Sequence, residues 1–266
     1  DQIFGENGAD TLFGGAGTDY IEGGSEGDTI DGGADNDVVY GGTGNDTMNG
    51  GGGNDQLFGE DGDDLLYGDR AADPAAFAGN DKLDGGVGND QLYGDAGNDS
   101  ILGGSGEDWI LGGSGNDTFE SAAAANFTAN DSAAGGNGSD VLSISGGGTY
   151  NIAGAAAFTD IESITVTDGT ATTLTLGTYN GSVTGGSGND TFSVAISALT
   201  SADTLDGSTG TGDTLSVTGG GNLDASTVLA NVSNVENLTF GSATTMTGGT
   251  STDLIWLAAA TVKGAA

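Results

Sequence analysis

A nine-residue repeat constrains the fold of this chain more than any other feature of its sequence. From Gly5 to Glu120 the sequence falls into blocks of the form G-G-x-G-x-D-x-U-x, where U is apolar. One block is stretched by an insertion, roughly Arg70 to Phe77, and recovers the phase at Gly79. Many blocks in one phase predict an architecture in which each repeat stacks on its neighbours. The blocks start at Gly5, Gly14, Gly23, Gly32, Gly41, Gly50, Gly59, Gly68, Gly85, Gly94, Gly103 and Gly112.

Each position of the block has a physical reason. Glycine at positions one, two and four permits positive φ and close backbone approach, so the first six residues can form a tight turn. Asn at position five, as in Asn36 and Asn45, suits the left-handed conformation better than most residues. Positions seven to nine read as a very short strand whose eighth residue points inward. The eighth positions are all apolar: Leu12, Ile21, Ile30, Val39, Met48, Leu57, Leu66, Leu83, Leu92, Ile101, Ile110 and Phe119.

These features predict an all-β, right-handed parallel β-roll with two nonapeptides in each coil. Leu12, Ile30, Met48 and Leu66 should form one internal column, and Ile21, Val39 and Leu57 the opposite one. Asp1 and Ile3 fit the sixth and eighth positions of a further block, so we expect the chain to be a piece of a longer protein.

The charge of the chain excludes several classes of partner. The formal net charge is -36, with 3 Lys and Arg residues in 266. A general nucleic-acid binder needs basic residues for the phosphates, and an anionic membrane surface would repel this chain. No apolar run is long enough for membrane insertion. Such acidity is typical of disorder, unless bound cations neutralise it within an ordered repeat. The chain has no Cys, so disulfides cannot stabilise it.

The repeat resembles the RTX (repeats-in-toxin) nonapeptide, the hemolysin-type calcium-binding repeat of type I-secreted bacterial proteins. The resemblance covers residues 1–120 and implies calcium ions between the turns of successive coils. Carboxylates at the sixth position and glycine carbonyls would hold each ion, and such oxygen ligands suit Ca²⁺ better than Mg²⁺. By this resemblance Asp10 pairs with Asp28, and Asp19 with Asp37, giving about ten ions or more along the roll. The alternative is that these aspartates merely form solvated turns. The implied ligands are Asp10, Asp19, Asp28, Asp37, Asp46, Asp55, Asp64, Asp81, Asp90, Asp99, Asp108 and Asp117.

Acidic residues outside the sixth position have a plainer interpretation. Asp61, Asp69 and Asp95 are expected to be solvated or to contribute only secondarily to cation binding.

The second half of the sequence keeps a weaker form of the repeat. We expect residues 121–134 to be a linker or capping segment, and residues 135–266 to be a degenerate RTX-like β-solenoid rich in Thr and Ser. Near-complete blocks at 135–142 and 185–192 add Asp140 and Asp190 to the candidate calcium ligands. This half resembles the repeats of bacterial S-layer and giant surface proteins.

The function expected from the sequence is structural rather than enzymatic. The chain has no His and no Cys, which excludes Ser–His–Asp, Cys–His and zinc chemistry, and no catalytic residue stands out. The first hypothesis is a calcium-dependent module of a secreted bacterial surface protein, such as an S-layer, adhesin or extracellular filament, that associates with copies of itself. The second is a secretion and folding module of a hydrolase or toxin whose catalytic domain lies outside this chain. An ice- or sugar-binding surface would need a regular outward Thr ladder, which the mixed seventh positions of the roll do not provide.

Overall fold

A computed structural model describes most of the chain, and its described residues contain strands but no α-helix. The predicted insertion Arg70–Phe77 lies outside the described residues, as do residues 123–130 of the predicted linker or capping segment. The described residues are 1–69, 78–122, 131–152, 157–177, 179, 181–197, 199–200, 203–219, 221–224, 229, 231–240, 244–247 and 261–264. Within them no helix is long and apolar enough to cross a membrane.

The chain divides into two compact units. The first comprises Asp1–Ser121, Ala125–Leu142 and Ala156–Ile161, and the second comprises Ala122–Ala124, Ser143–Ala155 and Glu162–Ala266.

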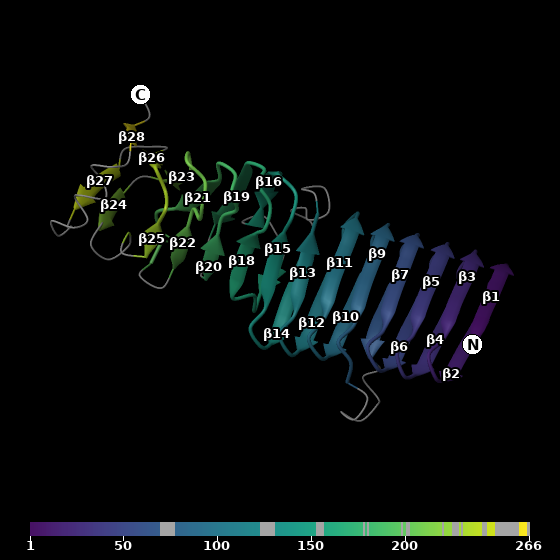
Figure 1. The fold of residues 1–266 in the computed structure, drawn as a ribbon. Coiled ribbons are helices and arrows are strands. Elements are labelled where there is room, and N and C mark those ends of the chain that lie inside the picture. Colours follow the sequence, from purple (N-terminus) through teal and green to yellow (C-terminus); the bar gives the residue numbers. More distant parts are fainter. Residues whose placement is uncertain are drawn as a thin grey trace. The chain divides into compact units, whose positions relative to one another are not determined.

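The first unit is a parallel β-roll in which the chain alternates between two sheets (Figure 1). Within each sheet every strand pairs in parallel with the strand one coil further on. One sheet contains β1 (Gln2–Asn7), β3 (Tyr20–Ser25), β5 (Val38–Thr43), β7 (Gln56–Asp61), β9 (Lys82–Val87), β11 (Ser100–Ser105), β13 (Thr118–Ser121) and the start of β15 (Val141–Ile144). The other contains β2 (Thr11–Ala16), β4 (Thr29–Ala34), β6 (Thr47–Gly52), β8 (Leu65–Asp69), β10 (Gln91–Ala96), β12 (Trp109–Ser114), β14 (Ser132–Asn137) and β17 (Ala157–Thr159).

The eighth positions form the core of this roll, as the sequence predicts. Leu12 pairs with Ile30, Ile30 with Met48, and Met48 with Leu66, which makes one internal column. Ile21, Val39 and Leu57 pair in the same way in the opposite column and are fully buried. Both the parallel β-roll and the period of two nonapeptides in each coil are therefore confirmed.

Two details of the nonapeptide differ from the sequence-based expectation. The strands are longer than three residues, because they run from the seventh position through the third position of the next block, as in Thr29–Ala34. The fifth-position Asn residues do not have positive φ. Among the described non-glycine residues of the nonapeptide blocks, positive φ occurs at second and fourth positions, such as Glu6 and Asp35. Instead the Asn side chains link neighbouring coils by accepting hydrogen bonds. The backbone amide of Asn54 donates to the side-chain Oδ1 of Asn36 at 3.0 Å, and the backbone amide of Asn98 donates to Oδ1 of Asn80 at 2.7 Å.

Aromatic side chains lie on the outer faces of the roll. The rings of Tyr40 and Phe58 stack with centroids 4.8 Å apart, and those of Tyr67 and Tyr93 stack at 4.9 Å. The Lys82 ammonium lies 5.5 Å from the Phe58 ring centroid. These contacts between neighbouring coils stabilise the outer faces of the roll in addition to the packing of its core.

The second unit has wider coils. Thr191 pairs with Thr214, and Thr214 with Asn237, so these strands lie further apart in sequence than neighbouring strands of the roll, whereas the pair Thr173 and Thr191 keeps the spacing of the roll. Its described core includes the column Tyr150, Leu174, Phe192, Leu215 and Leu238. One sheet contains β16 (Gly148–Asn151), β19 (Thr172–Gly177), β21 (Thr191–Ala195), β23 (Thr214–Thr218), β26 (Asn237–Phe240) and β28 (Thr261–Gly264). The other strands are β18 (Ser163–Val166), β20 (Ser182–Thr184), β22 (Thr204–Asp206) and β25 (Val232–Ser233), and the pair β24 (Gly221–Asp224) and β27 (Thr244–Thr247).

Candidate metal centres

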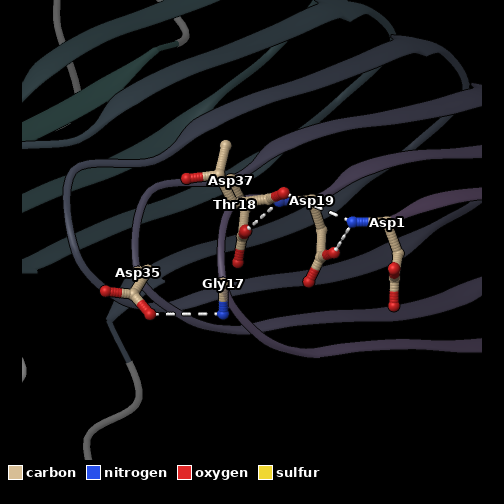
Figure 2. A network of polar contacts seen from close by, with 6 residues as sticks. All are labelled: Asp1, Gly17, Thr18, Asp19, Asp35 and Asp37. Atoms are coloured by element: carbon tan, nitrogen blue, oxygen red, sulfur yellow. Dashed lines mark hydrogen bonds and ion pairs between the residues drawn. The ribbon is translucent and has the colours of Figure 1, made fainter.

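The sixth-position aspartates form two columns, one along the turns that lead into each sheet. Oδ1 of every aspartate from Asp28 onward accepts a hydrogen bond from the backbone amide of the aspartate one coil earlier, as in Asp28 to Asp46 at 2.7 Å and Asp46 to Asp64 at 2.8 Å. Figure 2 shows the start of one column, where the Asp19 amide donates to Oδ1 of Asp37 and the amino group of Asp1 bonds to Asp19. The structure therefore brings together the pairs that the RTX resemblance implies.

The columns continue across the insertion. The Asp55 amide donates to Oδ1 of Asp81, and the Asp64 amide to Oδ1 of Asp90, each at 2.8 Å. The insertion thus leaves the register of the turns unchanged.

The second carboxylate oxygen of these aspartates has no hydrogen-bond donor. In the described part of the chain Oδ2 is buried and accepts no hydrogen bond in the following residues: Asp10, Asp19, Asp28, Asp37, Asp46, Asp55, Asp64, Asp81, Asp90, Asp99, Asp108 and Asp117. A buried carboxylate oxygen without a partner is costly, so each of these atoms calls for a positive group. Solvated turns would not leave the same atom buried and without a donor in coil after coil.

The first-position glycines show what lies beside each Oδ2. A Cβ on Gly41 would lie under 3.0 Å from both Oδ2 of Asp46 and the carbonyl oxygen of Gly59, one coil further on. The same two kinds of oxygen meet a Cβ built on Gly14, from Asp19 and Gly32. A carboxylate oxygen and a carbonyl oxygen therefore converge beside the bare Cα of the glycine. Two acceptors that converge without a donor form a cradle for a cation.

Burial raises the pKa of the following sixth-position carboxyls: Asp37, Asp46, Asp55, Asp64, Asp81, Asp90, Asp99, Asp108 and Asp117. The pKa of Asp55 and of Asp99 rises to about 7, and that of Asp81 to about 8. Desolvation is the largest cause, and the neighbouring aspartates of the column also raise the values, while the backbone amide donor lowers them. In the absence of a cation, burial in the folded roll therefore shifts these carboxyls toward the protonated form.

Two acidic residues outside the sixth position behave differently from each other. Asp61 is exposed, as expected for a solvated side chain. Asp69 is buried, contrary to the expectation of a solvated group, and its Oδ2 accepts a hydrogen bond from the Gly79 amide at 3.3 Å. Asp69 and Gly79 lie on either side of the insertion in the sequence, so this hydrogen bond joins the described residues that flank it.

Sequence reasoning missed Asp131. The Asp108 amide donates to Oδ1 of Asp131 at 3.0 Å, so this buried residue continues one column. It lies in the predicted linker or capping segment, and it follows Asp108 by 23 residues instead of 18, so it is out of phase with the nonapeptide. The residues Asp131-Ser132-Ala133-Ala134-Gly135-Gly136 do carry the signal, since they repeat the order of the sixth to second positions.

The two candidate ligands of the second half differ in their surroundings. Oδ1 of Asp140 accepts the Asp117 amide at 2.8 Å, so Asp140 continues the other column of the roll. Asp190 lies in the second unit, where Oδ1 accepts the Thr172 amide at 2.8 Å and Oδ2 accepts the Gly186 amide at 2.9 Å. Both oxygens of Asp190 are thus hydrogen-bonded, unlike those of the roll.

The donor set fits calcium. In the described residues no three His, Cys, Asp or Glu side chains gather into a metal site. A cation in a turn would therefore be held by the aspartates of successive coils and by glycine carbonyls. An irregular shell of carboxylate and carbonyl oxygens suits Ca²⁺, whereas Mg²⁺ demands near-ideal octahedral geometry.

These features define a class: a parallel β-roll whose turns collect oxygen ligands for a hard cation. The sequence matches the family described as RTX calcium-binding nonapeptide repeat (4 copies) over residues 1–30, 13–48, 22–57, 40–73, 78–101, 84–119, 93–128 and 168–194. Because the matches cover more than half of the chain, the chain belongs to this family. A comparison with curated proteins finds no significant match.

Proposed function

We propose that this calcium-binding structural module of RTX type serves in a type I-secreted bacterial surface protein, such as an S-layer, adhesin or extracellular filament. We also propose that calcium drives its folding after export. The observation that carries the proposal is the buried, donor-free Oδ2 repeated in every complete coil of the roll. Such a roll needs cations to compensate its buried carboxylate oxygens, and calcium is available for this outside the cell.

Energetics support a folding switch. Extracellular calcium modules bind with dissociation constants of about 10⁻⁴–10⁻³ M. At ten times that concentration each independent site adds about 1.4 kcal/mol, so ten sites would add roughly 14 kcal/mol, comparable with the stability of a whole domain. In a cytosol poor in calcium this contribution vanishes, and the net charge of -36 keeps the chain expanded. An unfolded chain is what export through a narrow channel requires.

The role proposed is structural rather than catalytic. The described aspartates of the roll repeat one arrangement from coil to coil, and no single turn is set apart as a reaction centre would be. The Thr- and Ser-rich coils of the second unit continue the repetitive character and support an extended scaffold, which we propose associates with further copies of itself.

Circular dichroism during a calcium titration tests the folding switch. We expect the β signal of the roll to be lost in EGTA and restored cooperatively by millimolar Ca²⁺, while equal Mg²⁺ has no effect. A β spectrum that persists unchanged in excess EGTA, with no metal detected in the sample, would refute calcium-driven folding.

Light scattering and electron microscopy of the calcium-loaded protein test self-association. Ordered sheets or filaments that dissolve in EGTA would support the surface role. A monomer at all calcium concentrations would instead favour a secretion and folding module.

A further inference from the structure

A turn in the second unit has the same unusual feature as the turns of the roll. This turn, Gly207–Asp213, leads into β23 and lies outside the residues that match the RTX family. Its sequence, Gly-Ser-Thr-Gly-Thr-Gly-Asp, has one residue more between the first glycine and the aspartate than the nonapeptide. The extra residue hides the turn from a search for the nonapeptide.

Asp213 occupies the middle of a carboxylate chain. The Asp190 amide donates to Oδ1 of Asp213 at 2.7 Å, and the Asp213 amide donates to Oε2 of Glu236 at 2.9 Å. Glu236 thus takes the place that an aspartate takes in the roll. Asp213 is 0% exposed, and its Oδ2 accepts no hydrogen bond in the described part of the chain. Asp190, by contrast, has amide donors on both oxygens.

Backbone oxygens converge on the same place. A Cβ on Gly210 would lie under 3.0 Å from both carboxylate oxygens of Asp213 and from the carbonyl oxygen of Gly188. A Cβ on Gly207 would lie 2.8 Å from Oδ2 of Asp213 and would also collide with the carbonyl oxygen of Asn234. Two glycines therefore leave a space that is bordered by oxygen atoms from three successive coils.

The charge near this space is negative. Glu236 accepts the Asp213 backbone amide, and Asp206 directly precedes the turn, where its Oδ1 accepts the Ser208 backbone amide at 2.9 Å. Among the described residues the one ion pair joins Asp1 and Asp19, so no described basic side chain pairs with Asp213.

We propose that the turn Gly207–Asp213 holds a further calcium-type cation, with Oδ2 of Asp213 as the carboxylate ligand and backbone carbonyls of neighbouring turns completing an all-oxygen shell. The inference rests on the proposed calcium function and adds to it, because it places a cation in wide coils that lack the nonapeptide. It also predicts that no ion is needed at Asp190, because backbone amides already donate hydrogen bonds to both of its carboxylate oxygens.

Hydrogen exchange with mass spectrometry on the full chain tests this site locally. At free calcium ten times the dissociation constant, we expect amides in residues 204–218 to exchange about tenfold more slowly than in EGTA. Asp213→Asn keeps an oxygen for the Asp190 amide but removes the charge, so it should abolish this calcium effect in residues 204–218. Asp168→Asn, whose carboxylate bonds to exposed Thr170, is the matched control and should keep the effect.

The outcomes separate this site from the roll. Loss of the calcium effect in residues 204–218 of Asp213→Asn, with the effect intact in residues 20–60, supports the proposal. A calcium effect of equal size in Asp213→Asn and the unsubstituted chain overturns it. Slowed exchange in residues 20–60 but none in 204–218 also overturns it, and means that a proton or a water satisfies Oδ2. No calcium effect in residues 20–60 would instead count against the proposed function.

Discussion

The sixth-position aspartate uses its two oxygens differently. In Asp46, Oδ1 accepts the Asp28 amide at 2.7 Å, while Oδ2 is buried without a donor and faces the cradle beside Gly41. The first oxygen needs only a lone pair, and an asparagine supplies that as well as an aspartate. The second oxygen needs a positive partner, so only the charge distinguishes a cation ligand from a turn former.

Asp46→Asn should therefore weaken calcium binding without unfolding the calcium-loaded roll. Asp46 stands between the turns of Asp28 and Asp64, so sites on both sides should lose affinity by at least about tenfold each. Isothermal calorimetry would show the loss.

Asp61→Asn is the matched control, because this exposed residue is also an acid of the roll but lies outside the sixth position. Equal losses of binding in the two variants would contradict the assignment of ligands by register.

The first-position glycine is tested by a pair of alanine variants. Gly41→Ala would put a Cβ into the cradle, against Oδ2 of Asp46, so it should both destabilise the roll by about 1–3 kcal/mol and weaken calcium binding. Gly17→Ala meets nothing within 4 Å but must adopt φ of 93°, which costs about 1–2 kcal/mol. Thermal unfolding at saturating calcium measures the loss of stability, and a calorimetric calcium titration of each variant measures the loss of affinity. If Gly17→Ala reduced calcium affinity as much as Gly41→Ala, the cradle would lose its support.

At the scale of single residues, the sequence predicts the role of a residue only where that residue recurs at the fixed nine-residue spacing. The sixth and eighth positions could be predicted because a fixed spacing shows them without knowledge of their contacts. The fifth-position Asn could not be interpreted from local propensity, since its side chain bonds to a residue one coil away. The period does not predict Asp131 and Asp213 as candidate ligands, because longer coils or an extra turn residue shift them out of phase.

At the scale of the strand, each coil adds one apolar side chain to each column. Leu57 is fully buried between Val39 and Leu83 of the same sheet, and no other layer of the roll can replace its contacts. The sequence predicts this pairing because the eighth position repeats without exception. It did not predict the extent of the strands, because the glycines that continue them are poor strand formers.

Leu57→Ala should destabilise the calcium-loaded roll by about 2–5 kcal/mol, since it leaves a cavity in a core to which each nonapeptide contributes a single apolar side chain. Phe13→Ala, a change at an outward position that is 66% exposed, should alter stability by less than about 0.5 kcal/mol. Urea unfolding at saturating calcium measures both. A similar cost for the two variants would contradict the inward direction of the eighth position.

At the scale of the whole molecule, charge controls which state of the roll is stable. The chain carries -36 formal charges, and much of the negative charge of the first unit is in two columns of closely spaced carboxylates. Calcium and protons are alternative ways to neutralise these columns. They therefore compete, and the competition can be measured.

We expect the stability of the roll to depend on pH in opposite directions with and without calcium. Without a cation, the pKa of Asp64 and of Asp108 is raised to about 6, that of Asp90 to about 7 and that of Asp81 to about 8, chiefly by desolvation. Between about pH 4 and 8 the folded roll therefore binds more protons than the unfolded chain, whose Asp pKa is about 3.9. This contribution to stability is fully present below pH 4 and is lost as the pH rises through the folded values. The metal-free roll, which is expected to be unfolded in EGTA at neutral pH, should accordingly regain β structure as the pH is lowered from 8 to 5.

In saturating calcium, lowering the pH over the same range should reduce the unfolding temperature, because protons displace the ions from the carboxylates. Circular dichroism of the metal-free protein and scanning calorimetry of the calcium-loaded protein, each at several pH values, check the two trends. If lowering the pH changed the stability of both samples in the same direction, the buried carboxylates would not exchange protons for calcium.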